Sequence, residues 1–94
     1  MTKQEIKEVL NRKMGWYTKY MAEYDQNDIR MRVVGDWNVK VHQFQHFGVC
    51  IDYINCYLYK GDVLVKEYNK MRKYKIFDMC VGEFTNIIDR DINK

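Results

Sequence analysis

The sequence predicts one α+β domain, in which an N-terminal and a C-terminal helix cover one face of a three- to four-stranded antiparallel meander sheet. Two observations carry this prediction. Apolar residues recur at three- and four-residue spacing near both ends of the chain, and they alternate with polar residues in the middle. The 94 residues are 47% hydrophobic, with no linker or repeat, so we expect a single domain spanning 1–94.

The first predicted element is a helix with a recognisable start. Thr2 and Glu5 have the spacing of a capping box, in which each side chain bonds to the backbone N–H of the other residue. One apolar stripe follows, formed by Ile6, Val9, Leu10, Met14, Tyr17, Met21 and Tyr24. We place the end of this helix near Tyr24, before the polar run 25–27.

The next two predicted elements are strands, because the apolar period becomes two in the runs 29–33 and 37–41. If both apolar sets share a face, Val33 pairs with Trp37 across a three-residue loop at 34–36. This loop contains a glycine, which suits a bulge.

A second hairpin is predicted around a two-residue turn at 60–61. This turn pairs Leu58 with Val63 on the core face and Tyr57 with Leu64 on the other face. The last element is a helix from about Tyr74 to near the C-terminus. Its wide apolar stripe comprises Phe77, Cys80, Val81, Phe84, Ile87, Ile88 and Ile92.

The composition predicts a cytoplasmic protein. No apolar run approaches the roughly 20 residues of a membrane span, and the N-terminus lacks the apolar core of a signal peptide. Cys50, Cys56 and Cys80 are odd in number and form no C-x-x-C pair, so we expect buried thiols rather than disulfides.

The chain carries no catalytic pattern that we recognise, and we expect it not to be an enzyme. It contains no serine for a Ser–His–Asp arrangement and no glycine-rich phosphate loop. His42, His46, Cys50 and Cys56 are zinc-ligand types, but they are spread along extended chain rather than gathered as short pairs. We therefore expect neither a metal nor a cofactor.

Positive charge is concentrated in one short segment. The basic cluster, as we call Lys70, Arg72, Lys73 and Lys75, has four positive charges, against a net charge of +3 for the whole chain. Cations at a helix N-terminus oppose the helix dipole, so stability does not explain them. A phosphate or carboxylate partner would use both the charges and the free N–H groups. A merely solvated loop is the alternative.

A second candidate surface is the sheet face away from the helices. The predicted registers place there Arg30, Arg32, Lys40, His42, Tyr57, Leu64 and Lys66. Mixed aromatic and basic side chains suit base stacking with phosphate contact, and they equally suit a protein partner. Long side chains that only keep the face soluble are the plain alternative. The predicted contact surface is the basic cluster, extended by Tyr57, Lys66 and Arg32.

Two resemblances bear on function. Helix, three strands and helix, with the run 70–75 before the last helix, resembles the double-stranded-RNA-binding domain, which carries a KKxAK stretch there. The family's proline- and histidine-containing loop is absent, and Val34-Gly35-Asp36 stands in its place. The size and the abundance of residues with A/T-rich codons are similar to those of small phage accessory proteins, including anti-CRISPR and other anti-defence inhibitors.

We therefore expect a non-enzymatic binding module, encoded by a phage or mobile element, that regulates or inhibits a host protein or a protein–nucleic acid complex. The alternative is a nucleic-acid-binding domain that uses the same basic cluster. We expect no membrane partner. A homodimer formed through an exposed edge strand stays open.

Overall fold

The computed structural model describes the backbone of residues 1–20, 30–45 and 52–94, and the side chains of 1–15, 30–42, 55–69 and 78–94. The elements follow in the order α1 (Lys3–Tyr20), β1 (Met31–Val34), β2 (Trp37–Gln45), β3 (Asp52–Lys60), β4 (Val63–Arg72) and α2 (Lys73–Ile92). Each strand pairs antiparallel with the next, in the spatial order β1-β2-β3-β4. The predicted α+β class with a meander sheet is confirmed.

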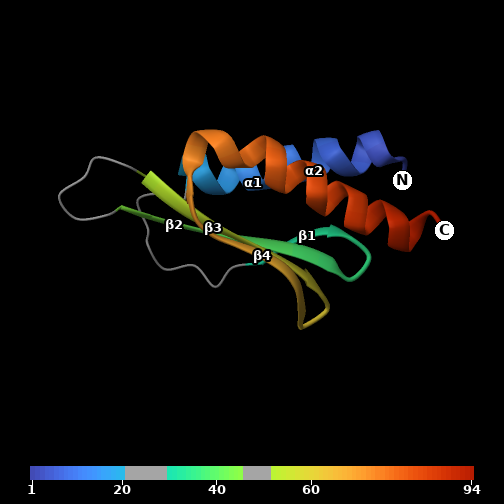
Figure 1. Cartoon of the computed structure of the whole chain (residues 1–94). Coiled ribbons are helices and arrows are strands. Elements are labelled where there is room, and N and C mark those ends of the chain that lie inside the picture. Colours follow the sequence, from blue (N-terminus) through green and yellow to red (C-terminus); the bar gives the residue numbers. More distant parts are fainter. Residues whose placement is uncertain (21–29, 46–51) are drawn as a thin grey trace.

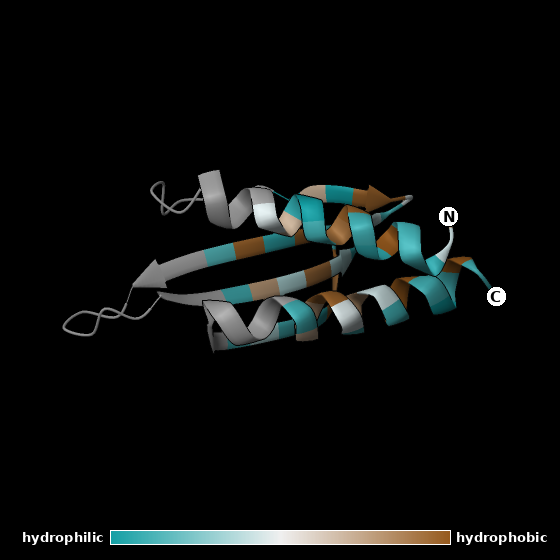
Figure 2. Cartoon of the chain, turned by 90° about the horizontal axis from the view of Figure 1, so that it is seen from above, coloured by the Kyte–Doolittle hydropathy of each residue, from teal (hydrophilic) through white to brown (hydrophobic). Residues whose placement is uncertain are grey.

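Both helices lie on the same face of the sheet (Figure 1). Seen from above, they run side by side over the strands (Figure 2). Helix α1 contacts β1 and β2, whereas α2 contacts β3 and β4, and the two helices also contact each other. The helices therefore form one layer and the sheet the other, as the two apolar stripes predicted.

The capping box at the start of α1 is confirmed. The backbone N–H of Thr2 donates to Glu5 Oε1 at 3.0 Å, and that of Glu5 donates to Thr2 Oγ1 at 3.2 Å. The bond from the Thr2 backbone lowers the pKa of the Glu5 carboxyl from its ordinary value. The predicted end of this helix near Tyr24 lies outside the described residues.

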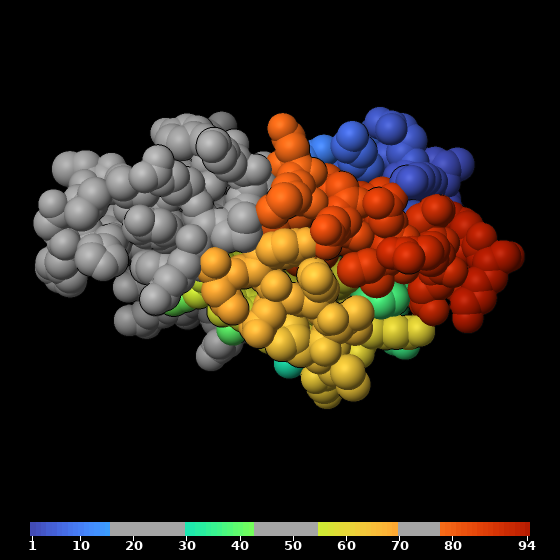
Figure 3. All heavy atoms as spheres, in the orientation of Figure 1, coloured from blue at the N-terminus to red at the C-terminus, as the bar shows by residue number. Residues whose placement is uncertain are grey.

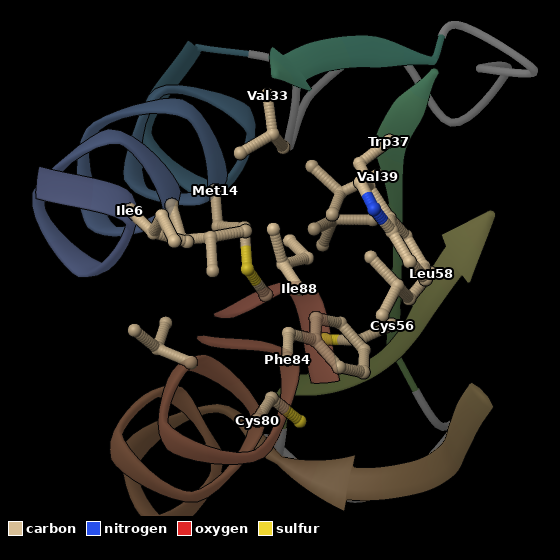
Figure 4. Close-up of a cluster of buried hydrophobic side chains, with 13 residues drawn as sticks. Ile6, Met14, Val33, Trp37, Val39, Cys56, Leu58, Cys80, Phe84 and Ile88 are labelled. Carbon is tan, nitrogen blue, oxygen red and sulfur yellow. The ribbon is translucent and has the colours of Figure 1, made fainter. Parts of the chain in front are cut away.

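The core lies between the two layers (Figure 4). Its buried side chains come from α1, from the first three strands and from α2: Ile6, Leu10, Met14, Val33, Trp37, Val39, Val41, Cys56, Leu58, Cys80, Val81, Phe84 and Ile88. The Cys56 and Cys80 thiols belong to this cluster as small hydrophobes. The contact with Cys80, together with burial, raises the pKa of Cys56, so this thiol stays protonated.

The first hairpin closes on a shorter turn than predicted. Val34, not Val33, pairs with Trp37, and an irregularity in the ladder follows Arg32. The three-residue loop is therefore wrong, and a two-residue turn begins at Gly35, where φ is 54°. Val33 and Trp37 are nevertheless both buried, because the irregularity takes up one residue and keeps both side chains on the core side.

The second hairpin corrects the predicted register. Its turn begins at Gly61, where φ is 60°, so Lys60 pairs with Val63. A glycine at the first central position provides the positive φ that tight hairpin turns require, which favours this turn over the predicted one at 60–61. The register then shifts between Leu58 and Tyr59, and Leu58 pairs with Lys66. The predicted Leu58–Val63 pair is therefore wrong.

One polar cluster ties the sheet to the end of α2. Trp37 Nε1 donates to Asp91 Oδ2 at 3.0 Å, and Lys60 Nζ lies 3.0 and 3.1 Å from the two carboxylate oxygens. These bonds, first that from Lys60 and then that from Trp37, lower the pKa of Asp91. The cluster fixes α2 over the first residue of β2 and the last residue of β3.

Candidate functional site: the open face of the sheet

The face of the sheet opposite the helices is the main candidate surface. In the described part of the chain, no helix lies against it (Figure 1). Along β2 and β3 its residues alternate with buried ones. We call this surface the open face and define it by Arg32, Asn38, Lys40, His42, Asn55, Tyr57, Tyr59, Leu64 and Glu67.

Two tyrosines lie at the centre of the open face, and a cation lies over each ring. Lys40 pairs with Tyr57 across β2 and β3, and its Nζ is 5.0 Å from the centroid of that ring. The guanidinium carbon of Arg30 is 4.4 Å from the centroid of the Tyr59 ring. The two ring centroids are 6.5 Å apart. Cation–π contacts of this kind hold aromatic side chains in a defined position.

Arg30 reaches from the start of β1 to the turn between β3 and β4. It precedes β1, yet its side chain donates to the carbonyl oxygen of Gly61 at 3.1 Å and pairs with Asp62 at 3.2 Å. The Asp62 carboxylate is almost fully solvated, with 96% of its side chain exposed, so this ion pair adds little stability. Its effect is to orient the guanidinium over Tyr59.

The two hairpin turns meet at one end of the open face. The N–H of Gly61 donates to the carbonyl of Asp36 at 2.8 Å. Asn38 Nδ2 donates to both turns, at 3.0 Å to Asp36 and at 3.1 Å to Gly61. Arg32 Nε donates to the carbonyl of Gly35 at 2.9 Å. The backbone bond from Gly61 to Asp36 and the two side-chain bonds from Asn38 hold the two turns together, so this end of the face is preorganised.

A shallow hollow of about 500 Å³ lies between these turns. Its lining mixes two cations, two anions and an amide: Arg30, Arg32, Asp36, Asn38 and Asp62, with the turn glycines. A phosphate ligand would meet repulsion from both aspartates. The mixed charge suits the polar rim of a protein interface, where donors and acceptors of both signs are satisfied together.

Of the predicted additions to the contact surface, two lie on the open face and one does not. Arg32 and Tyr57 are there. Lys66 pairs with the buried Leu58, and its Nζ lies 5.4 Å from the Tyr68 ring, whose hydroxyl donates to Glu83 of α2. Lys66 is therefore on the helix side, and its predicted place is wrong because the register shift reverses the alternation.

The basic cluster lies at the far end of β4 from the Gly61 turn. Lys70 and Arg72 belong to β4, and Lys73 and Lys75 belong to the first turn of α2, which holds no acidic residue. The side chains of all four lie outside the described residues. That the basic cluster contacts a partner stays a prediction.

The candidate metal ligands are separated by the sheet. His42 pairs with Asn55 on the open face, whereas Cys56 is fully buried on the opposite face. These two side chains cannot bind one ion. His46 and Cys50 lie outside the described residues. Among the side chains that the structure describes, no three His, Cys, Asp or Glu residues are grouped so that they could hold a metal ion.

Sequence reasoning missed Tyr59 as a site residue. The signal was present, because Tyr59 follows Tyr57 by two residues and must share its face within one strand. The contact between Arg30 and Tyr59 could not be predicted, because Arg30 precedes β1 and no strand pairing places it beside Tyr59.

Comparison of the chain with family models, with curated proteins and with solved structures gave no match. Neither described helix is both long and apolar enough to span a membrane.

Proposed function

We propose that this chain is a binding protein that engages a protein partner through its open face, with Tyr57, Tyr59 and Arg30 at the centre of the contact. The observation that carries this proposal is the pair of tyrosines, each under a cation, on a sheet face that no described helix covers. Tyrosine and arginine, together with tryptophan, are enriched among interface hot spots.

The rigidity of this surface supports the proposal. Tyr57 and Tyr59 are on the central strand pair, and the Arg30 fork is held by Gly61 and Asp62. Side chains that are already ordered lose less entropy when a partner binds. The open face thus offers large amphipathic contacts at a low ordering cost.

The contacts favour a protein over a nucleic acid at this face. A base that stacked on either tyrosine would compete with the cation that already lies over one face of the ring. Asp36, Asp62 and Glu67 also border the same surface and would repel phosphates. A protein surface can instead pair with charges of both signs.

The composition supports a more specific version of this proposal. Residues with A/T-rich codons are abundant, and the chain is small and without a recognisable catalytic pattern. We therefore propose a regulator or inhibitor, encoded by a phage or mobile element, that acts by occupying the surface of a host protein.

Nucleic-acid binding is the second candidate, and the basic cluster favours it. Four cations within six residues, at the junction of β4 and α2, match a phosphate-binding site at a helix N-terminus. This candidate requires a steep salt dependence. On duplex DNA, the slope of log K against log salt concentration should be about −0.9 for each phosphate that the protein neutralises.

The test is an affinity purification of tagged protein from lysate of the organism that carries the gene, with and without nuclease treatment, followed by quantitative mass spectrometry. Three baits are compared: wild type, the double variant Tyr57→Ala/Tyr59→Ala, and the control Lys7→Ala/Arg12→Ala. The control removes two exposed cations from α1, far from the open face. Circular dichroism confirms that each bait is folded.

We expect wild type and control to retain one stoichiometric protein. The tyrosine variant should retain at least tenfold less of that protein. Equal retention by all three baits would refute the open face as the contact surface. If every partner disappears with nuclease, fluorescence anisotropy with duplex oligonucleotides at two salt concentrations tests the second candidate. A flat salt response would then exclude phosphate binding.

A further inference from the structure

One row of the open face carries opposite charges on its two sides. Tyr57 pairs with Lys40 of β2 on one side and with Glu67 of β4 on the other. A cation, an aromatic ring and a carboxylate therefore follow one another across the sheet. We call the Lys40 side the basic flank of the open face and the Glu67 side its acidic flank.

A narrow apolar strip runs between the two flanks. Tyr57 and Tyr59 are successive open-face residues of β3, and their ring centroids are 6.5 Å apart. Leu64 of β4 pairs with Tyr59 and is 43% exposed, so it widens the strip at this end. On the β2 side, Tyr59 pairs with the polar Asn38. The strip is thus bordered by polar side chains and follows the direction of β3.

The described helices leave this side of the sheet uncovered. Figure 3 shows α2 in orange and red above β4 in gold, and Figure 1 shows both helices on that same side of the sheet. The central strands β2 and β3 each pair with a strand on both sides. A segment that lies on the open face cannot extend their ladders, so it has to satisfy its own backbone hydrogen bonds.

An amphipathic α-helix fits this surface. A helix bonds its backbone internally and presents one apolar stripe between two polar flanks. Helical residues four positions apart are separated by about 6 Å along the axis, close to the 6.5 Å between the two tyrosine rings. Two strand spacings, about 9–10 Å, separate Lys40 from Glu67, and a helix is about 10 Å across. A partner sheet would need a wide apolar face instead.

We propose that the open face binds an amphipathic α-helix of the partner protein, which lies along β3. Its apolar stripe contacts Tyr57, Tyr59 and Leu64. One of its flanks is acidic and faces Lys40, and the other is basic and faces Glu67. This inference rests on the proposed function and specifies the segment of the partner that makes the contact. Charges at the rim of such a contact select the partner more than they add affinity.

The test uses three synthetic peptides of about 15 residues, stapled because isolated helices of this length are marginal in water. All three carry the same leucine stripe. The split peptide has glutamates on one flank and lysines on the other, the acidic peptide has glutamates on both, and the basic peptide has lysines on both. Since a helix can lie in either direction along β3, the order of the flanks in the split peptide does not matter.

Two charge variants of the full chain are compared with wild type. Glu67→Lys makes both flanks of the open face basic, so its preference should move from the split peptide to the acidic one. Asp78→Lys is the matched control, because it makes the same change in net charge at an exposed carboxylate of α2, on the other side of the sheet. Both positions are exposed, so both variants are expected to fold.

Binding is measured from the backbone amide signals of Tyr57 and Tyr59 in NMR titrations at low salt, where charges are least screened. We expect wild type and Asp78→Lys to bind the split peptide about fivefold more tightly than the other two, which corresponds to about 1 kcal/mol. Glu67→Lys should bind the acidic peptide about fivefold more tightly than the split peptide. The variant Tyr57→Ala/Tyr59→Ala should bind none of them.

Equal affinity of wild type for the three peptides, or no binding of any of them at about 1 mM, would overturn the inference. A preference that stays the same in Glu67→Lys, or that moves equally in Asp78→Lys, would overturn it as well. A protein that is retained from lysate through the tyrosines, without any preference among the peptides, would support the proposed function and overturn only the helical partner.

Discussion

The two faces of the same sheet differ in what holds their side chains. On the helix side of β3, Cys56 and Leu58 are completely buried and contact apolar neighbours. On the open face of the same strand, Tyr57 and Tyr59 are half-buried and lie under cations. Neighbouring residues in one strand therefore belong to different environments, because side chains in a strand alternate between faces.

This difference separates stability from recognition. The helix-side residues gain their free energy from removal of apolar surface from water, at about 1.5–3 kcal/mol for a fully buried aliphatic side chain. The open-face residues gain little from burial, and their cation–π contacts contribute about 0.5–1 kcal/mol each at exposed positions. Substitutions on the open face should weaken binding and have small effects on stability. Substitutions on the helix side should lower stability and have small effects on the binding surface.

The largest expected effect comes from adjacent positions in β3. Leu58→Ala removes a fully buried side chain, so we expect the free energy of unfolding to fall by about 2–5 kcal/mol. Tyr57→Ala removes a half-buried side chain and one cation–π contact, so we expect a loss of about 1 kcal/mol. Urea denaturation followed by circular dichroism measures both. Equal losses at the two positions would contradict the separation of the two faces.

A smaller effect tests the turn that sets the register of β4. Gly61→Ala places a side chain at a φ of 60°, so we expect the protein to lose about 1 kcal/mol of stability. The added methyl meets no atom within 4 Å, so the loss reports backbone conformation alone. Gly82→Ala, on α2 with equal space around it, is the control and should be neutral or stabilising. An unchanged denaturation midpoint for Gly61→Ala would argue against this turn.

The smallest effect concerns Asp91, which links the helix layer to the sheet. Its pKa lies below the ordinary value of 3.8 in the folded chain, so its stabilising contribution is complete above that pH. The contribution is lost as the pH falls through the lowered pKa. Asp91→Asn keeps an acceptor for Trp37 but removes the charge opposite Lys60. We expect this variant to be less stable than wild type at pH 7.

The difference in free energy of unfolding between wild type and Asp91→Asn should become smaller below pH 3.8, because the wild-type carboxylate then begins to take up a proton. Urea denaturation at several pH values measures this difference. Asp78→Asn, an exposed carboxylate of the same helix, is the control. A stability difference that stays constant from pH 7 to pH 2.5 would show that the Lys60 contact is not electrostatic.

Local patterns were sufficient to predict the elements and the layers of this protein. The three- and four-residue apolar spacing identified both helices, the period of two identified the strands, and Thr2 with Glu5 identified the start of α1. These features depend on residues near one another in the chain, which is why the sequence contains them. The open face followed from the same alternation, with Arg32 and Tyr57 placed on it correctly.

Only the tertiary structure decided the registers and the contacts that depend on them. The register shift between Leu58 and Tyr59 put Lys66 on the helix side, because one extra residue in β4 exchanges the two faces of the strand beyond it. The reach of Arg30 to Tyr59 and Asp62, and of Trp37 and Lys60 to Asp91, joins segments far apart in the sequence. Such contacts depend on how whole elements pack, and no local pattern encodes them.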